Sequence, residues 1–134
     1  MKQETLTASI FHRYVFEVFF YSLSLLLCFF FLLLVAPEIS KHPKNTRVVE
    51  GQAVVFRCLV QGNPKPSVRW TKNEELNLAA NPRLRSTLIN DTHTLIIVDV
   101  HPTDAGQYRC LANNSVGQTT SPAATLTVEE YCKY

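Results

Sequence analysis

Two hydrophobic patterns divide the chain near residue 36. No charged residue occurs between Val18 and Ala36, and this stretch would extend about 28 Å as a helix. Since that length approaches the thickness of a bilayer core, we expect residues 1–36 to form one hydrophobic helix directed to a membrane. After Pro37 the pattern changes to short runs in which apolar and polar side chains alternate.

The leader has two possible fates, a retained signal-anchor or a cleaved signal peptide. It is longer than the apolar region of an ordinary secretory signal, and cleavage after Ala36 would leave Leu34 at a position that favours a small residue. Basic residues lie on both sides of the segment, so the positive-inside rule fixes no orientation: Lys2 and Arg13 precede it, and Lys41, Lys44 and Arg47 follow it. Both fates export the following residues if the carboxyl end of the leader faces away from the cytosol. Cys28 is interpreted as a small apolar residue of this helix.

Alternating side chains after Pro37 predict β-strands. In the run from Ala53 to Val60, the side chains of Val54, Phe56, Cys58 and Val60 share one face, which we expect to point inward. The same rule predicts further inward positions: Val68, Trp70, Leu95, Ile97, Val100, Tyr108, Cys110, Ala112, Ala124, Leu126 and Val128. Turn-forming residues separate the runs at 62–64, 81–82, 90–91 and 113–114. No helical period follows Pro37, so the pattern predicts an all-β domain with antiparallel sheets over residues 37–129.

A spaced motif narrows the fold. Cys58, Trp70 and the run Asp104-x-Gly106-x-Tyr108-x-Cys110 resemble the signature of the immunoglobulin superfamily. The strings GNPKP at 62–66 and CLANNSVG at 110–117 are similar to those of its I-set class. The resemblance covers nearly everything after the leader and implies an immunoglobulin-like antiparallel β-sandwich.

The resemblance also implies structural roles for the motif residues. Cys58 and Cys110 are expected to form a disulfide across the core, with Trp70 packed on it. The hydroxyl of Tyr108 is expected to bond backbone at the preceding corner, where Gly106 leaves room for the turn. Asp104 is expected to pair with an arginine entering the fourth strand, Arg83 rather than Arg85. A catalytic or metal-binding Asp104 is disfavoured because no second acid with suitable spacing accompanies it.

Composition argues against several classes of function. The formal net charge is only +2, from 13 basic and 11 acidic residues, so no field is available to attract nucleic acid. Four glycines form no phosphate-binding loop, and four cysteines show no C-x2-C zinc spacing. The histidines share no motif with a nucleophile or an acid; they are His12, His42, His93 and His101, of which the last two are interpreted as strand-edge residues. We expect no enzyme, no cofactor, no metal and no small-molecule substrate.

The expected compartment is extracellular. A disulfide requires an oxidising environment, which agrees with an exporting leader. Two N-glycosylation sequons, at Asn90 and Asn113, fall in predicted turns; the alternative for each is an asparagine that serves only the turn. The predicted location is the membrane with the domain outside, or secretion if the leader is cleaved.

The predicted function is recognition or adhesion through binding of a protein, either a cell-surface or matrix ligand or a second copy. Candidate contact residues are those expected to point outward: Arg57, Leu59, Arg69, Thr71, Arg109 and the loop 73–82. A cytosolic sarcomeric relative of the I-set type is an alternative, which the leader and the cysteine pair argue against.

A second alternative is a fragment of a receptor tyrosine kinase ectodomain. The strings GNPKPSVRW and DAGQYRC resemble an immunoglobulin domain of muscle-specific kinase. The ending YCKY at 131–134 resembles the first residues of the frizzled-type domain that follows immunoglobulin domains in that receptor and its orphan-receptor relatives. Residues 130–134 are then either a tail or the start of a truncated frizzled-type module, and the frizzled-type and kinase parts would be lacking. Cys132 is expected to be the first cysteine of that module, a tail thiol or an intermolecular partner.

Overall fold

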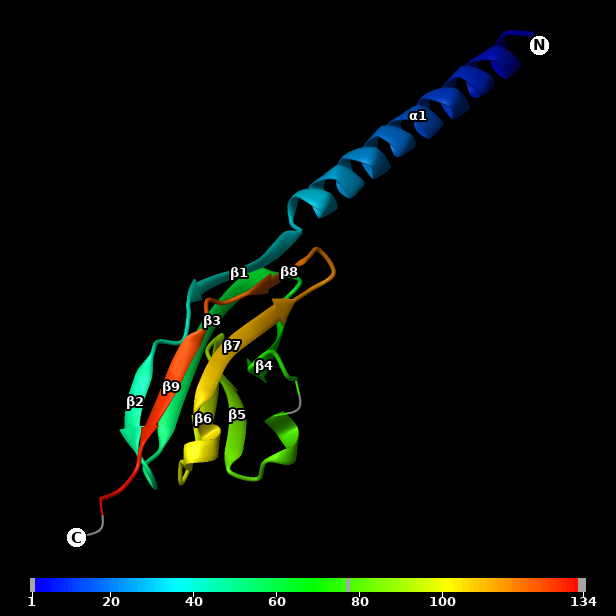
Figure 1. Ribbon diagram of the computed structural model, residues 1–134. Helices are drawn as coiled ribbons and strands as arrows, with labels where there is room; N and C mark the ends of the chain where they lie inside the picture. The colour runs from blue at the N-terminus through cyan, green and yellow to red at the C-terminus, as the bar shows by residue number, and fades with distance from the viewer. Residues whose placement is uncertain (1, 77, 133–134) are drawn as a thin grey trace. The chain divides into compact units, whose positions relative to one another are not determined.

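The computed structural model describes residues 2–76 and 78–132, and the chain divides into two compact units, Met1–Leu34 and Val35–Tyr134 (Figure 1). Side chains of residues 2–6 and 79 also lie outside the described set. The predicted tail 130–134 is described only as far as Cys132. Residue 77, in the candidate loop 73–82, also lies outside the described residues.

The first unit is a single helix, α1 (Lys2–Leu32). Its segment Thr7–Leu32 is long and apolar enough to cross a membrane, with 26 residues and a mean hydropathy of 2.2. At about 1.5 Å per residue this segment is about 39 Å long. The predicted end of the helix at Ala36 is wrong, because Val35 and Ala36 already belong to a strand. Pro37 disfavours helical geometry at Ala36 but does not by itself account for an end at Leu32.

The second unit is a sandwich of two sheets, as predicted (Figure 1). Among the described residues, one sheet has the order β1-β3-β6-β5, and the other has the order β2-β9-β7-β4 with β8 paired to β7. The strands are β1 (Val35–Lys41), β2 (Thr46–Val49), β3 (Val54–Asn63), β4 (Ser67–Lys72), β5 (Leu84–Ile89), β6 (Thr92–Ile97), β7 (Gly106–Asn113), β8 (Gln118–Thr120) and β9 (Ala124–Glu129). Two short 3-10 helices, η1 (Leu78–Ala80) and η2 (Pro102–Asp104), lie in the connections.

One pairing departs from the antiparallel prediction. β2 pairs with β9 in parallel, with Thr46 opposite Leu126 and Val49 opposite Glu129. β1 pairs with β3 in the first sheet, whereas β2 joins the second sheet after the connection around Pro43. Because the chain changes sheets there without a hairpin reversal, β2 meets β9 running in the same direction. The prediction failed since alternation does not reveal a strand that changes sheets.

The core lies between the sheets and is formed by the inward positions. β3 shows the predicted alternation, with Val54, Phe56, Cys58 and Val60 all buried. The other fully buried apolar positions are Trp70, Leu95, Ile97, Val100, Tyr108, Cys110, Ala112, Ala124 and Leu126, while Val68 and Val128 are partly buried against this cluster. All of these positions were predicted to point inward, and that prediction is confirmed.

Candidate functional site

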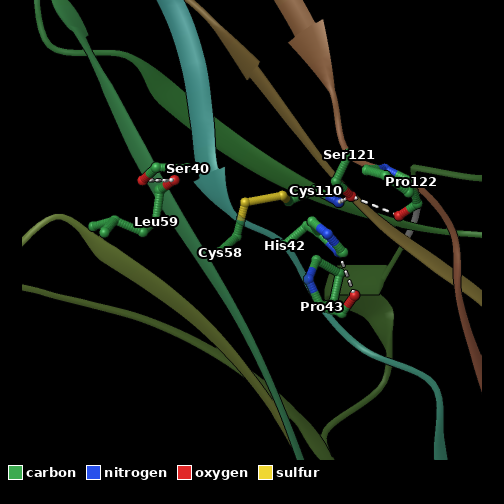
Figure 2. The surroundings of a disulfide bond; sticks show 8 residues. All are labelled: Ser40, His42, Pro43, Cys58, Leu59, Cys110, Ser121 and Pro122. Carbon is green, nitrogen blue, oxygen red and sulfur yellow. Dashed lines mark hydrogen bonds between the residues drawn. A yellow bond between two sulfur atoms is a disulfide. The ribbon is translucent and has the colours of Figure 1, made fainter.

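A disulfide joins the two sheets at the centre of the core (Figure 2). Cys58 on β3 and Cys110 on β7 are bonded through their Sγ atoms, with a Cα–Cα distance of 6.6 Å and no solvent exposure. Their positions on inward faces of strands from opposite sheets make the bond a tie through the core. The predicted disulfide is therefore confirmed. Cys28 and Cys132 are free and exposed.

Ser121 supports the second half of this bridge, and the sequence did not single it out. Its hydroxyl accepts the backbone N–H of Cys110 at 3.0 Å and donates to the carbonyl of Pro122 at 3.0 Å (Figure 2). Its own N–H donates to the carbonyl of Cys110 at 2.9 Å. Ser121 is 2% exposed and interrupts the last strand between β8 and β9. The Ser-Pro pair was the available signal, because it marks a break in a strand.

Trp70 lies directly opposite Cys110 in the β4–β7 ladder and is 5% exposed. Cross-strand neighbours on one face pack against one another, so the indole belongs to the core beside the bridge. Its Nε1 is buried and has no hydrogen-bond partner among the described residues. An unpaired buried donor costs about 1–3 kcal/mol, so the apolar packing of this ring must exceed that cost.

Tyr108 closes the corner before β7. Its hydroxyl donates to the carbonyl of Asp104 at 2.7 Å, and its ring stacks on Phe56 at a centroid distance of 5.1 Å. Burial is the main reason that the pKa of the Tyr108 hydroxyl lies well above its ordinary value, with the negative charge of Asp104 adding to it. The hydroxyl is therefore a permanent donor that fixes the corner.

The carboxylate of Asp104 is bound by Arg83 through two contacts, Nη1 to Oδ2 at 2.5 Å and Nη2 to Oδ1 at 3.0 Å. The N–H of His101 also donates to Oδ2, at 2.8 Å, and Arg83 Nη1 donates to the carbonyl of Asp99 at 2.7 Å. Burial acts to raise the pKa of Asp104, but the hydrogen bonds from Arg83 and His101 and the charge of Arg83 lower it below its usual value. The structure thus places Arg83, and not Arg85, beside this acid.

Gly106 begins β7 in a conformation that favours glycine, with φ of +153°. A Cβ atom there would lie 2.8 Å from the Asn73 side-chain oxygen. That oxygen accepts the N–H of Gln107 at 2.9 Å, so Asn73 is held in place. The close approach of this loop is the reason for glycine at the corner.

The two sequon asparagines occupy different settings. Asn90 lies in the two-residue turn between β5 and β6, is exposed and has φ of +48°. Asn113 was expected in a turn, but it ends β7, where its side-chain oxygen accepts a hydrogen bond from Ser67. The turn is served by Asn114: its Nδ2 donates to the carbonyls of Val35 and Pro64, and its Oδ1 accepts the N–H groups of Val116 and Gly117.

The candidate contact residues do not form one surface. Arg57 and Leu59 point outward from β3 in the first sheet, whereas Arg69 and Arg109 point outward from β4 and β7 in the second. Thr71 was expected to be exposed but is only 8% exposed. Thr71 lies opposite Arg109, and we attribute its burial to the longer side chains of its neighbours. Sequence reasoning separated inside from outside but could not separate the two outer faces.

The loop after β4 borders an open groove of about 550 Å³ between β4 and β5. The groove is mostly apolar, and its described lining residues are Val68, Arg69, Trp70, Leu76, Leu78, Leu84, Ser86 and Leu95. Leu76 in this loop is 54% exposed. The loop 73–82 therefore contributes apolar side chains to this groove, while its Glu74 and Glu75 are exposed charges.

The histidines form no catalytic group with other described residues. His93 lies in the inner strand β6 opposite Cys58, and His101 precedes η2 near Asp99, so the prediction of strand-edge positions is wrong for both. Burial is the main cause that lowers the pKa of His93. Within residues 2–76 and 78–132, no three His, Cys, Asp or Glu side chains gather as metal ligands would.

Comparison with known proteins identifies the family. The sequence profile of the immunoglobulin I-set domain matches residues 37–128. The chain belongs to the immunoglobulin I-set family. The disulfide, the Trp70 position and the Tyr108 corner are thus the parts by which an I-set sandwich is built.

This I-set domain is similar to short segments of much larger proteins. It is 46% identical over 92 residues to human Roundabout homolog 2, which covers 69% of this chain and 6% of that protein. It is 34% identical over 83 residues to chicken Protein sidekick-2, covering 62% of this chain and 4% of that protein. With human Peroxidasin homolog it shares 36% identity over 91 residues, covering 67% of this chain and 6% of that protein. The matched region thus spans a small fraction of each relative.

Solved structures agree with the fold. A mutant form of the titin M10–obscurin-like 1 Ig complex matches with a TM-score of 0.69 and 36% identity, covering 75% of this chain and 99% of the matched chain. The titin M3 domain matches with a TM-score of 0.67 and 33% identity, covering 71% of this chain and 98% of the other. These neighbours are single immunoglobulin domains of nearly the same extent as residues 37–128.

Proposed function

We propose that residues 37–129 act outside the cytosol as a recognition domain that binds a protein partner, with no catalysis and no cofactor of its own. The observation that carries this proposal is the combination of a fully buried Cys58–Cys110 disulfide with a preceding apolar segment, Thr7–Leu32. A disulfide of this kind forms in an oxidising compartment, and the apolar segment supplies the means of export. I-set membership and the similarity to Roundabout and sidekick domains support a binding role.

Export has a direct test in the full chain carrying a carboxyl-terminal tag in a mammalian cell. We expect protease or a membrane-impermeant label added outside to reach the tag, and we expect a glycan at Asn90. A shift of mobility that disappears in the variant Thr92→Val would report that glycan, because the change removes the sequon but keeps a β-branched residue. A tag protected from outside would contradict the proposal.

The fate of the leader determines whether the domain is anchored or released. Sequencing the amino terminus of the product distinguishes the two: an intact Met1 indicates a retained anchor, whereas a new terminus near 38–41 indicates cleavage. Helix α1 ends at Leu32, so cleavage near 38–41 would also remove the first residues of β1. We therefore propose the retained anchor, because β1 pairs with β3 over Val35–Lys41 and its loss would expose a paired strand.

Protein binding is expected on the outer face of the β2-β9-β7-β4 sheet. Arg69 and Arg109 lie there without an ion-pair partner among the described residues, whereas Arg47 on the same sheet is paired with Glu129. Unpaired arginines are favourable contacts for acidic protein surfaces. Against a panel of cell-surface and matrix proteins, we expect saturable binding that the double change Arg69→Glu and Arg109→Glu abolishes and that Arg57→Glu on the opposite face leaves intact. Binding to no panel member, or equal loss in both variants, would contradict this assignment.

A receptor tyrosine kinase ectodomain is the second candidate context. It is supported by the strings GNPKPSVRW and DAGQYRC, which lie at the β3–β4 connection and at the start of β7. Its other support, the ending YCKY, extends beyond the described residues. The coding sequence past Tyr134 is the test: a frizzled-type cysteine pattern beginning at Cys132 would favour this context.

A further inference from the structure

β5 differs from the strands at the other ends of the two sheets. β1 contains Pro37 and two irregularities of register, β2 has only four residues, and β4 ends in Lys72 after a proline-containing connection. Proline, lysine, bulges and shortness all discourage pairing with another chain. β5 has six residues, pairs with β6 without any irregularity and contains neither proline nor lysine. Its free side, visible at the end of the sheet in Figure 1, lacks these protections.

The turn after β5 determines which backbone groups are free. Asn90 and Asp91 both have left-handed φ, 48° and 61°, and they form a two-residue hairpin turn between Ile89 and Thr92. In such a hairpin the closing pair exchanges hydrogen bonds, and bonding alternates along the strand. The N–H and C=O groups of Ser86 and Leu88 therefore point away from β6. The whole stretch from Arg85 to Ile89 is exposed.

Side chains on both faces of β5 suit an antiparallel copy of the same strand. On the inner face, Leu88 is 49% exposed and Ser86 lines the apolar groove described above. On the outer face, Arg85 has no ion-pair partner among the described residues. The acid Asp91 lies at the far end of the strand and is paired with the exposed Lys65 at 2.8 Å, so Arg85 of a second copy would add to this surface ion pair or replace it. A strand with a cation at one end and an anion at the other is complementary to itself only when the two copies run in opposite directions.

We propose that β5 pairs antiparallel with β5 of a second copy, with Thr87 opposite Thr87 of the second copy. In this register Ser86 lies opposite Leu88 of the second copy. The free N–H and C=O groups of each of these residues form hydrogen bonds with those of the other. Leu88 of each copy then lies beside the groove of the other, and Arg85 lies diagonal to Asp91. The two β1-β3-β6-β5 sheets become one continuous sheet across a two-fold axis.

This inference goes beyond the proposed recognition function and adds a second copy of this chain as a further partner. It uses β5, whereas the proposed protein-binding face is on the other sheet. Strand pairing over six residues buries a small area, which places the dimer among the weak interfaces. Attachment of both copies to one membrane would raise their effective concentration and favour the pairing.

Cysteine cross-linking tests the register in the full chain in detergent micelles, both with the glycan expected at Asn90, which would lie opposite Leu84 of the second copy, and after its enzymatic removal. The free thiols are first removed by Cys28→Ser and Cys132→Ser. In the proposed register, Thr87 faces Thr87 of the second copy without exchanging hydrogen bonds with it. The Cα atoms of two residues paired in this way are about 4.5 Å apart, within the range of a disulfide. We expect Thr87→Cys to give a disulfide-linked dimer on mild oxidation. The matched control Thr127→Cys, exposed on inner strand β9 of the other sheet, is expected to stay monomeric.

Charge exchange tests the diagonal pair. We expect Arg85→Glu to weaken the dimer about tenfold. The change places a negative charge beside Asp91 of the other copy, and the two-fold axis makes this repulsion occur twice. Combining Arg85→Glu with Asp91→Arg is expected to restore cross-linking at Thr87→Cys. The change Leu88→Lys, which places a charge at the groove, is expected to abolish it.

Equal cross-linking of Thr87→Cys and Thr127→Cys would overturn the proposal, because it would show association through the helix alone. No rescue by the double charge exchange would overturn the register. Cross-linking is measured in micelles and does not depend on export, so failure of the export experiment leaves this test intact. Successful export with monomeric Thr87→Cys would refute self-pairing while leaving the recognition function standing.

Discussion

At the scale of single residues, Asp104 holds the corner between η2 and β7. Its carboxylate accepts hydrogen bonds from Arg83 and His101, and its carbonyl accepts the Tyr108 hydroxyl. The side chain is only 6% exposed, so these partners replace the water that it loses. The acid is therefore a structural element, and its chemistry is that of an ion pair rather than of a catalyst.

Replacing Asp104 with Asn is expected to lower the free energy of unfolding at pH 7 by about 2–3 kcal/mol, less than a fully buried pair because Arg83 is partly exposed. Urea unfolding measures it. Arg85→Gln is the control, with an expected change within about 0.5 kcal/mol because that side chain is exposed. Equal losses in the two variants would contradict the assignment of Arg83 as the partner.

The lowered pKa of Asp104 gives the pair a definite pH dependence. A carboxyl whose pKa is lower in the folded state contributes its full stability above its unfolded value, near 3.9, and loses it as the pH falls through the folded pKa. We expect the wild-type protein to lose stability below about pH 4 more steeply than Asp104→Asn. Parallel acid-unfolding curves for the two proteins would be the contrary result.

Trp70 carries a further prediction at this scale. Replacing it with Ala is expected to cost about 3–5 kcal/mol, because a large core side chain is removed next to the bridge. Thermal or urea unfolding followed by circular dichroism provides the measurement. Trp70→Phe serves as the control, since it removes the unpaired Nε1 and keeps most of the apolar ring. A small change for Trp70→Ala would show that the ring does not fill the core.

At the scale of elements, side-chain amides fix several connections. Asn114 joins the end of β7 to β1 and to the connection after β3, Asn73 joins the loop after β4 to β7, and Asn45 Oδ1 accepts the N–H of Thr125 at 2.9 Å. Each amide links segments far apart in the sequence. Asparagine in this domain thus joins elements as well as forming turns.

Asn114→Ala is expected to destabilise the domain by about 1–2 kcal/mol, because four hydrogen bonds are lost at a half-buried position. The comparison is Asn113→Ala, whose exposed side chain accepts one hydrogen bond, from Ser67, among the described residues. We expect its cost to stay near 0.5 kcal/mol. Both are measured by chemical unfolding of protein freed of glycans, and a reversed order would contradict the roles assigned to the two residues.

At the scale of the whole molecule, one covalent bond ties the sheets of a small domain together. Cys58 and Cys110 are separated by 52 residues, and the chain-entropy estimate for closing such a loop is about 4 kcal/mol. Stabilities of natural domains are about 5–15 kcal/mol, so this bond supplies a large part of what holds the sandwich folded.

The double change Cys58→Ala and Cys110→Ala is expected to lower the free energy of unfolding by about 4 kcal/mol. The matched variant is Cys28→Ser with Cys132→Ser, which should leave stability of the domain unchanged because both thiols are exposed and free. Non-reducing peptide mapping should show Cys58 joined to Cys110. Recovery of Cys58 as a free thiol from exported protein would remove the argument for an oxidising compartment.

The sequence alone determined which side chains of this domain point into the core. Alternation identified every fully buried apolar position of β3. The resemblance of the cysteine, tryptophan and tyrosine motif to the immunoglobulin signature implied the disulfide and the sandwich. These features were predictable because burial imposes a period of two and because the motif residues meet one another in the core. The apolar leader was likewise evident from composition, apart from its end at Leu32.

Tertiary structure decided what depends on neighbours from distant parts of the chain. The parallel β2–β9 pair, the burial of Thr71 and the roles of Ser121 and Asn114 follow from contacts between strands, which no local pattern records. The same holds for the two outer faces: Arg57 and Arg69 have the same alternation, but their strands lie in different sheets. Alternation distinguishes the two faces of one strand, and only the packing of the sheets assigns each strand to its place.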